Sequence, residues 1–271
     1  MTAGVVIAAG LILTVTFGGA VVSADHAWGS YHWARTTHSF DLTVVNSTTD
    51  DWDQFVTAAV ADWSQSGVLN MVEDAGGSTS NNIRRQCKAP TGKIRICNLA
   101  YGNNGWLGLA GISIDSNGHI LTGYTKLNDT YFSSGFYNTP DWKQSVACQE
   151  LGHDVALEHQ DEDFNNTSLF SCMDYQDPPF AWANAHDFDQ LDLIYGHLDS
   201  YNSYAGGGSG GGGDVCDAPP GKGCNKAGVG QGNSKSEWGM SLGRRGAAET
   251  FIRTDPDGTR HLTFVRWVDP R

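Results

Sequence analysis

The chain has little positive charge. Of its 271 residues only 17 are Lys or Arg, against 30 Asp or Glu, so the formal net charge is −13 at pH 7. A surface of this sign repels the phosphates of nucleic acids and anionic lipid headgroups. The composition therefore argues against a nucleic-acid partner. At 39% hydrophobic and 11% aromatic residues, it also excludes a wholly disordered chain.

Several familiar motifs are missing as well. No Cys-x-x-Cys pair occurs, so a structural zinc site built from cysteines is not indicated. No P-loop or dinucleotide-binding loop is recognisable, and the segment around Cys148 contains no nucleophile elbow. Nucleotide-dependent and serine-hydrolase chemistries are therefore not supported.

Positive charge is absent from the N-terminus, where no Lys or Arg precedes Arg35. Residues 4–22 are apolar, and Val22-Ser23-Ala24 is typical of a signal-peptidase site before Asp25. Residues 1–24 are therefore predicted to be a signal peptide, although the usual basic start is missing. The alternative is an uncleaved N-terminal anchor, because 4–22 could just span a bilayer and would leave the protein on the membrane, facing outward.

The cysteines fit an extracellular chain. They are Cys87, Cys97, Cys148, Cys172, Cys216 and Cys224. An even number in a secreted protein indicates disulfides, and the spacing favours pairing each cysteine with its neighbour in this order. The alternative is that some of them remain free, buried thiols.

A Gly/Ser-rich linker, residues 204–213, divides the chain into a body (25–203) and a C-terminal tail (214–271). In the tail, two alternating runs flank Asp255-Pro256-Asp257-Gly258, which predicts a β-hairpin. We expect the tail to be a small stabilising appendage.

The body has the pattern of an α+β fold with a mixed sheet. Strands are predicted at 40–46, 68–74, 93–102 and on both sides of Ser116-Asn117-Gly118. Helices are predicted from Asp50, from Thr139-Pro140-Asp141 and across 184–198. The helix that begins near Pro140 carries the residues of greatest chemical interest.

Those residues lie in "CQELGHDVALEH", residues 148–159. Gln149 and His153 are four apart and share a helical face, with Glu150 beside them. His159 is too distant for that face unless the chain turns near Ala156 and Leu157. Two ligands one turn apart with an adjacent glutamate is the arrangement in which a zinc-bound water is activated.

The segment resembles the metzincin zinc proteases, in particular their matrixin-like branch, whose pattern is HExxHxxGxxH followed by a methionine-containing turn. "SCMDY" (171–175) is similar to that Met-turn, with Met173 beneath the metal. The resemblance covers roughly residues 30–200. It implies a zincin-like twisted sheet, an active-site helix and a C-terminal helix, and it implies zinc bound by Gln149, His153 and His159, with Glu150 as general base.

Two residues depart from the metzincin pattern. Gln149 replaces the first histidine, and an amide oxygen is a weak zinc ligand. Ala156 replaces the glycine at which the chain leaves the helix, where a positive φ would cost an alanine about 1 kcal/mol or more. A Cys148–Cys172 bridge would join the helix to the Met-turn and offset a weaker ligand set by roughly 3 kcal/mol.

Two functions follow. The first is a secreted zinc endopeptidase, which polarises a water for Glu150 and binds extended peptide or protein substrate along an edge strand near Ile112–Ile114. The second is a non-catalytic secreted module that binds peptide or protein on the same scaffold. Asp161, Asp163 and Asn165 could also hold a structural Ca²⁺, although they fail the EF-hand pattern and a solvated loop is the alternative.

Overall fold

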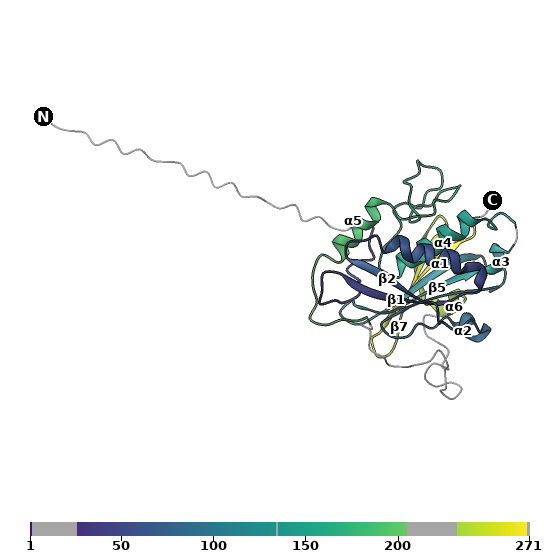
Figure 1. The fold of residues 1–271 in the computed structure, drawn as a ribbon, viewed down its shortest axis with the longest axis horizontal. Helices are drawn as coiled ribbons and strands as arrows, with labels where there is room; N and C mark the ends of the chain where they lie inside the picture. Colours follow the sequence, from purple (N-terminus) through teal and green to yellow (C-terminus); the bar gives the residue numbers. More distant parts are fainter. Residues whose placement is uncertain (2–25, 134, 205–231, 270–271) are drawn as a thin grey trace.

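The computed structural model describes residue 1 and residues 26–133, 135–204 and 232–269. These residues form a mixed α+β fold around an eight-stranded sheet, as the sequence predicts (Figure 1). Almost all of the predicted signal peptide and linker, together with Cys216 and Cys224, lies outside the described residues. Within them, no helix is both long and apolar enough to cross a bilayer.

Four parallel strands form one half of the sheet. In spatial order they are β2 (Leu69–Asp74), β1 (Phe40–Ser47), β3 (Ile94–Leu99) and β5 (Ile120–Asn128). The β-branched and aromatic residues of these segments suit a sheet that is buried on both faces. All four were predicted, with boundaries shifted by a few residues.

The other half of the sheet is antiparallel. β4 (Trp106–Ile114) turns back at Gly118, whose φ of +94° suits glycine, to pair with β5. Beyond β4 come β8 (Arg260–Trp267), β7 (Ala248–Thr254) and β6 (Met240–Arg245). The predicted hairpin is present as β7 and β8. It does not stand apart as an appendage, because β8 pairs with β4 and continues the main sheet.

Helices α1 (Asp50–Trp63) and α4 (Pro140–His153) pack against each other over one face of the sheet (Figure 1). α1 begins with three acidic residues in its first turn, which suits the positive end of the helix dipole. Its buried face includes Trp52, Phe55 and Trp63, and this face contributes to the larger of two hydrophobic clusters.

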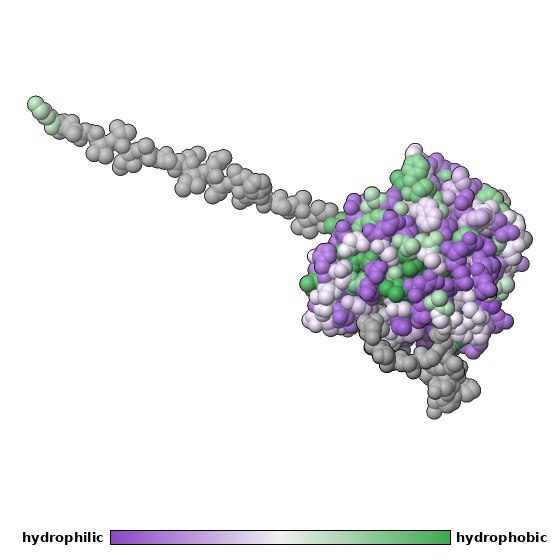
Figure 2. Space-filling view, viewed as in Figure 1, coloured by the Kyte–Doolittle hydropathy of each residue, from purple (hydrophilic) through white to green (hydrophobic). Residues whose placement is uncertain are grey.

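The opposite face carries the smaller hydrophobic cluster, which includes Trp106, Trp238 and Trp267. Short helices α2 (Asn81–Gln86) and α6 (Lys235–Trp238) cover it, and a disulfide joins Cys87 to Cys97 there. Two further helices, α3 (Asp129–Phe132) and α5 (Ala185–Ile194), follow β5 and the loop after α4. On the face shown in Figure 2, hydrophilic residues surround small apolar groups.

Candidate functional site

Helix α4 brings together three of the predicted site residues. It begins where the Thr139 hydroxyl accepts a hydrogen bond from the Trp142 amide (3.2 Å), with Pro140 in the first turn. It ends at His153, so Gln149, Glu150 and His153 occupy its last two turns, and all three are buried. The capping residues thus place the predicted site at the end of a rigid element.

The segment around Met173 supports this helix from below. Cys148 and Cys172 form a disulfide, as the spacing predicts. Met173 is fully buried, and its sulfur would lie 2.7 Å from a Cβ added at Gly152. Gly152 is therefore needed for the close approach of the Met173 segment to α4.

The chain reverses direction after α4, and this turn returns His159 to the end of the helix. Ala156 has a φ of +75°, so the position does adopt the left-handed conformation that disfavours alanine. This turn brings His159 Nε2 to 3.0 Å from His153 Nε2, with the two rings nearly perpendicular. His153 and His159 are therefore brought together as predicted.

Both imidazoles of this pair are held neutral. Burial lowers the pKa of His153 well below its usual value, and the neighbouring His159 lowers it further. Burial also lowers the pKa of His159, to about 3. His153 Nδ1 lies 2.8 Å from the Leu157 carbonyl and must carry the proton there, so the lone pair of Nε2 faces His159.

Gln149 does not extend towards the histidine pair as a free ligand. Its Nε2 donates to the Cys172 carbonyl (3.1 Å), and its Oε1 accepts from Arg266 Nη1 (2.7 Å). Both ends of the amide therefore have partners. The second of these, Arg266, comes from β8 at the far end of the chain.

The Arg266 guanidinium is buried and lies above the rings of Tyr175 (4.8 Å) and Trp142 (5.3 Å). Burial raises the pKa of Glu150 well above its usual value, and the Arg266 charge lowers it. Within the described residues, four buried atoms here have no hydrogen-bond partner: both Glu150 carboxylate oxygens, the Tyr175 hydroxyl and Arg266 Nη2.

This donor set does not fit a three-ligand zinc site. Two neutral imidazoles face each other suitably, but the third expected ligand, Gln149, is engaged by a guanidinium. A metal bound to the same Gln149 oxygen would lie within about 5 Å of Arg266 Nη1, given a Zn–O distance of about 2.0–2.2 Å. No catalytic step through a metal can be derived for this arrangement.

The expected substrate-binding edge is also occupied. β4 lies between β5 and β8, and Ile112 pairs with Leu262 of β8. The prediction that peptide adds to β4 near Ile112–Ile114 is therefore wrong for this structure. The chain's own C-terminal strand lies where the substrate was expected, and its Phe264 stacks on His153.

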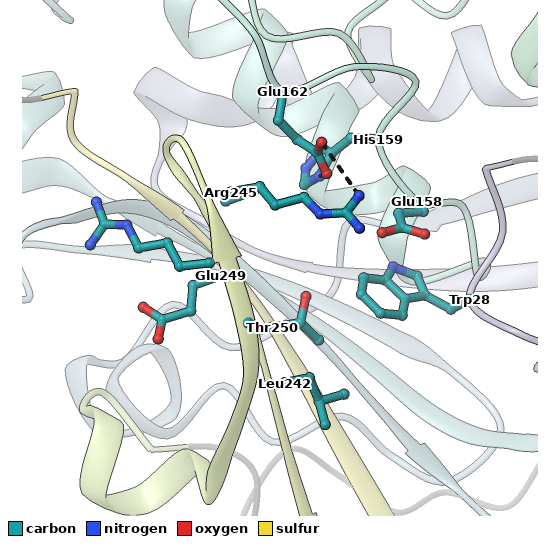
Figure 3. Close-up of a pocket in the computed structure, with 11 residues that line it drawn as sticks. Trp28, Glu158, His159, Glu162, Leu242, Arg245, Glu249 and Thr250 are labelled. Atoms are coloured by element: carbon teal, nitrogen blue, oxygen red, sulfur yellow. Dashed lines mark ion pairs between the residues drawn. The ribbon is translucent and has the colours of Figure 1, made fainter.

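A pocket of about 250 Å³ opens beside the histidine pair (Figure 3). Its lining includes Trp28, Glu158, His159 and Glu162, together with residues of β6 and β7. Burial and the neighbouring Glu162 both raise the pKa of Glu158. Arg245 lies 3.9 Å from Glu162, which makes one weak ion pair across the opening.

Side chains of the acidic loop after His159 are hydrogen bonded within the loop. Asp161 accepts a hydrogen bond from the Asp163 backbone amide, and Asp163 accepts one from the Asn165 amide. Among the described residues, the one group of three potential metal ligands is elsewhere: His32, His197 and Asp199. The Ca²⁺ alternative for Asp161, Asp163 and Asn165 gains no support.

Sequence reasoning missed two residues that decide this site. Arg266 carried a usable signal, because it shares a strand face with Leu262 and Phe264, and a charge on an apolar face indicates a buried partner. Gly108 carried none. A Cβ at Gly108 would lie 2.6 Å from Glu150 Oε1, which shows how closely β4 approaches α4.

Comparison with known proteins assigns no family. No protein-family model matches the chain, and no curated protein matches its sequence.

Proposed function

We propose that the protein is an extracellular, non-catalytic module on a metzincin-like scaffold, which binds an extended peptide or protein segment without cleaving it. The observation that carries this proposal is the hydrogen bond from Arg266 to Gln149. It places a cation at the position where zinc chemistry needs a ligand.

Electrostatics favours this choice over a metal site. At an effective dielectric of about 20, a unit charge and a divalent ion about 5 Å apart repel by roughly 6–7 kcal/mol. The Glu150 carboxyl would offset little of this, because its burial raises its pKa well above the usual value and disfavours its charged form. The guanidinium therefore competes with zinc for the same space and the same partner.

A peptide would need another strand edge, since β4 is paired on both sides. β6 forms one end of the sheet, all six of its residues are exposed, and they include Met240 and Leu242. β6 also borders the pocket that contains Glu158 and Glu162. Strand addition at β6 would place a side chain of the peptide in this pocket, and a lysine would relieve the repulsion between the two glutamates.

The extracellular assignment rests on the two disulfides, Cys87–Cys97 and Cys148–Cys172. Such bonds persist in oxidising compartments and are rare in the cytosol. They agree with the signal peptide predicted for residues 1–24.

Zinc content and peptide hydrolysis test the non-catalytic assignment. We expect wild type to show no zinc-dependent hydrolysis and to lose no zinc on His153→Ala substitution. We expect Gln149→His alone to remain inactive, because Arg266 stays in place. Zinc that disappears in His153→Ala, together with hydrolysis that disappears in Glu150→Ala, would overturn the assignment.

Binding is tested with labelled Val/Thr decapeptides that carry Lys, Ala or Glu at the centre. We expect the Lys peptide to bind best and to lose at least tenfold in affinity in Glu158→Gln/Glu162→Gln. The matched control is Glu73→Gln in β2, at the opposite end of the sheet. Equal binding of all three peptides, or an equal loss in the control, would contradict binding at β6.

A zinc endopeptidase kept closed by its own hairpin is the second candidate. The unpartnered oxygens of Glu150 and Tyr175 favour it, because buried polar groups without partners are costly and point to a missing occupant. This candidate expects Arg266→Ala to gain zinc-dependent hydrolysis that Glu150→Ala then abolishes. An inert Arg266→Ala protein that still folds would eliminate it.

A further inference from the structure

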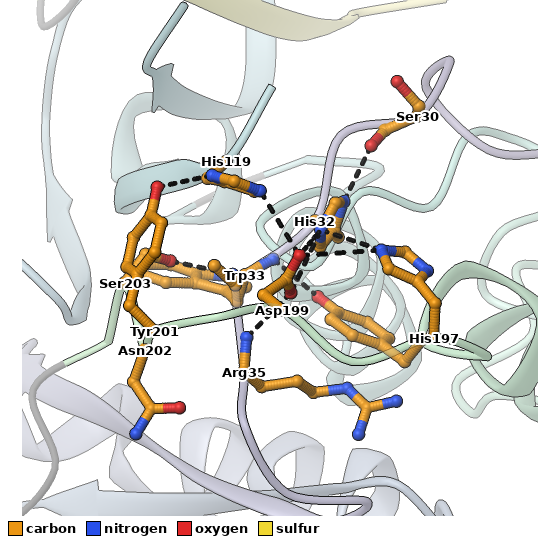
Figure 4. Close-up of polar contacts among 12 residues, drawn as sticks. Ser30, His32, Trp33, Arg35, His119, His197, Asp199, Tyr201, Asn202 and Ser203 are labelled. Carbon is orange, nitrogen blue, oxygen red and sulfur yellow. Dashed lines mark hydrogen bonds and ion pairs between the residues drawn. The ribbon is translucent and has the colours of Figure 1, made fainter. Parts of the chain in front are cut away.

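A second group of histidines lies outside the α4 site, where three segments of the chain meet (Figure 4). His32 belongs to the segment before β1, His119 to the turn between β4 and β5, and His197 and Asp199 to the segment after α5. We propose that His32, His197 and Asp199 bind a zinc ion that ties these segments together.

The distances between donor atoms match a single ion. His32 Nε2 lies 3.1 Å from His197 Nε2 and 3.4 Å from both carboxylate oxygens of Asp199. His197 Nε2 lies 3.9 Å from Asp199 Oδ1. Ligands about 2.0–2.1 Å from a tetrahedral zinc lie roughly 3.3–3.4 Å from one another, so an ion fits among these three with small adjustments.

The groups behind the ligands hold them in the form that metals need. His32 Nδ1 lies 2.8 Å from the Ser30 carbonyl and carries the proton there, so Nε2 presents a lone pair. Asp199 Oδ2 accepts a hydrogen bond from the Arg35 amide (2.9 Å), which orients its carboxylate. Both supports belong to the N-terminal segment that contributes His32.

His119 is the nearest fourth donor. Its Nε2 lies 3.4 Å from Asp199 Oδ1, and its Nδ1 is hydrogen bonded to the Tyr201 hydroxyl at 2.5 Å (Figure 4). The His119 side chain is only 13% accessible, so it is held close to this group. Two imidazoles and a carboxylate with a third imidazole beside them form a donor set that suits zinc.

A hydrogen bond between His32 and His197 is the alternative to an ion. In this alternative His197 donates from Nε2 and His32 Nε2 accepts. It does not explain why the Asp199 carboxylate also lies 3.4 Å from His32 Nε2. An ion satisfies His32, His197 and Asp199 at once.

The ion would have a structural role next to the α4 site. Trp33, which follows His32, donates from its indole to the Asp154 carbonyl at the end of α4 (3.0 Å). Zinc at His32 would therefore steady the residue that holds this end of the helix. The His197 side chain is 54% accessible, which leaves a path for the ion to enter.

The test measures zinc uptake by the full chain after treatment with EDTA. We expect one zinc per chain, and affinity at least 100-fold weaker in both His197→Ala and Asp199→Asn. His197→Ala is the safer variant because its side chain is half exposed. The matched control is His38→Ala, an exposed histidine in the segment before β1 that also carries His32. His153→Ala should retain the zinc, which separates this site from α4.

A second readout is thermal stability. A hundredfold excess of zinc over its Kd should raise the Tm by roughly 5–10 °C in wild type and His38→Ala, and not in His197→Ala. Co²⁺ in place of zinc should give the visible absorption of a four-coordinate site. No zinc uptake by wild type, unchanged uptake in the two ligand variants, or loss of the zinc in His153→Ala would overturn the proposal.

Discussion

Two histidine pairs in this molecule have nearly the same geometry, but only the first lies beside a buried guanidinium. His153 and His159 bring their Nε2 atoms to 3.0 Å, and His32 and His197 bring theirs to 3.1 Å. The first pair lies near the Arg266 guanidinium as well as the Glu162 carboxylate, 3.7 Å from His159 Nδ1, whereas the second faces the Asp199 carboxylate. Imidazole geometry alone therefore does not identify a metal site, because the charge of the third group decides whether a cation is attracted or repelled.

The two pairs also differ in access. His153 is 1% exposed and lies beneath β8, whereas the His197 side chain lies at the surface. An ion could reach the second pair at the surface, whereas only His159 of the first pair borders a pocket and His153 is covered by Phe264 of β8. The surroundings of the first pair follow from where the C-terminal strand docks, because β8 supplies both Arg266 and Phe264.

The largest effect should come from removing the cation of the α4 site. Arg266→Met should lower the free energy of unfolding by roughly 3–5 kcal/mol, because it leaves the Gln149 oxygen buried without its partner and removes the positive charge beside Glu150. Urea unfolding measures this. Arg260→Met on the same strand, where the side chain is half-buried, should cost under about 1 kcal/mol.

Adding Glu150→Gln to Arg266→Met should recover part of the loss, because it removes the buried carboxylate that Arg266 balances. Additive losses in this double-mutant cycle would mean that the two charges are not coupled, and the contrast between the two histidine pairs would then lose its electrostatic basis.

The Cys148–Cys172 disulfide should stabilise the segments around His153 and His159 and should have no effect on zinc binding at His32 and His197. Replacing both Cys148 and Cys172 by Ser should cost about 3 kcal/mol, from the entropy of closing a loop with a sequence separation of 24. We expect the zinc affinity of the full chain to stay unchanged, because none of the residues around His32 is attached to this bridge. A large loss of zinc affinity in a folded variant would show that the two sites are linked.

Acidification should lower the free energy of unfolding by about 2 kcal/mol through His159 of the α4 pair. The folded-state pKa of His159 is about 3, below the usual value near 6.5, so between these values the unfolded chain binds a proton that the folded chain does not. Stability from this residue is present above pH 6.5 and is lost as the pH falls, by about 1.4 kcal/mol per unit. From pH 7.5 to 5.0 the loss is thus roughly 2 kcal/mol.

His159→Asn should remove this part of the pH dependence, measured by urea unfolding in EDTA. His38→Asn, which changes an exposed histidine, should leave the dependence as it is in wild type. An identical pH profile in wild type and His159→Asn would show that the buried imidazole is not kept neutral by the fold.

The smallest effect concerns the turn after α4. Ala156→Gly should raise stability by up to about 1 kcal/mol, or roughly 2–4 °C in Tm, since glycine adopts a φ of +75° without strain. Ala147→Gly in the interior of α4 is the opposite control and should lower stability by about 1 kcal/mol. Destabilisation by both would mean that the strain at Ala156 is negligible beside its packing.

Much of the fold could be read from local patterns. The strands around Ser116-Asn117-Gly118, the start of α4 at Pro140 and the hairpin at Asp255–Gly258 all appear as predicted. Each depends on interactions within a short segment: a turn that needs glycine, a helix cap, or alternation of apolar residues. The Cys148–Cys172 bridge was also predicted, because its residues flank the two segments that had to meet.

The site could be predicted only in part. Spacing along one helix and the turn at Ala156 predicted that His153 would meet His159 near Glu150. No spacing predicted that β8 would add to β4, because the pairing of distant strands is not marked in either segment. That pairing placed Arg266 on Gln149 and closed the expected substrate edge.

The sequence by itself determined the acidic surface, the α+β class, the two observed disulfides and the helix that presents Glu150 and His153. These follow from composition and from contacts between residues close in the chain. Only the tertiary structure decided which charge each histidine pair would meet. Arg266 reaches Gln149 across 117 positions, and Asp199 reaches His32 across 167, so folding and not local preference assigned a cation to one pair and a carboxylate to the other.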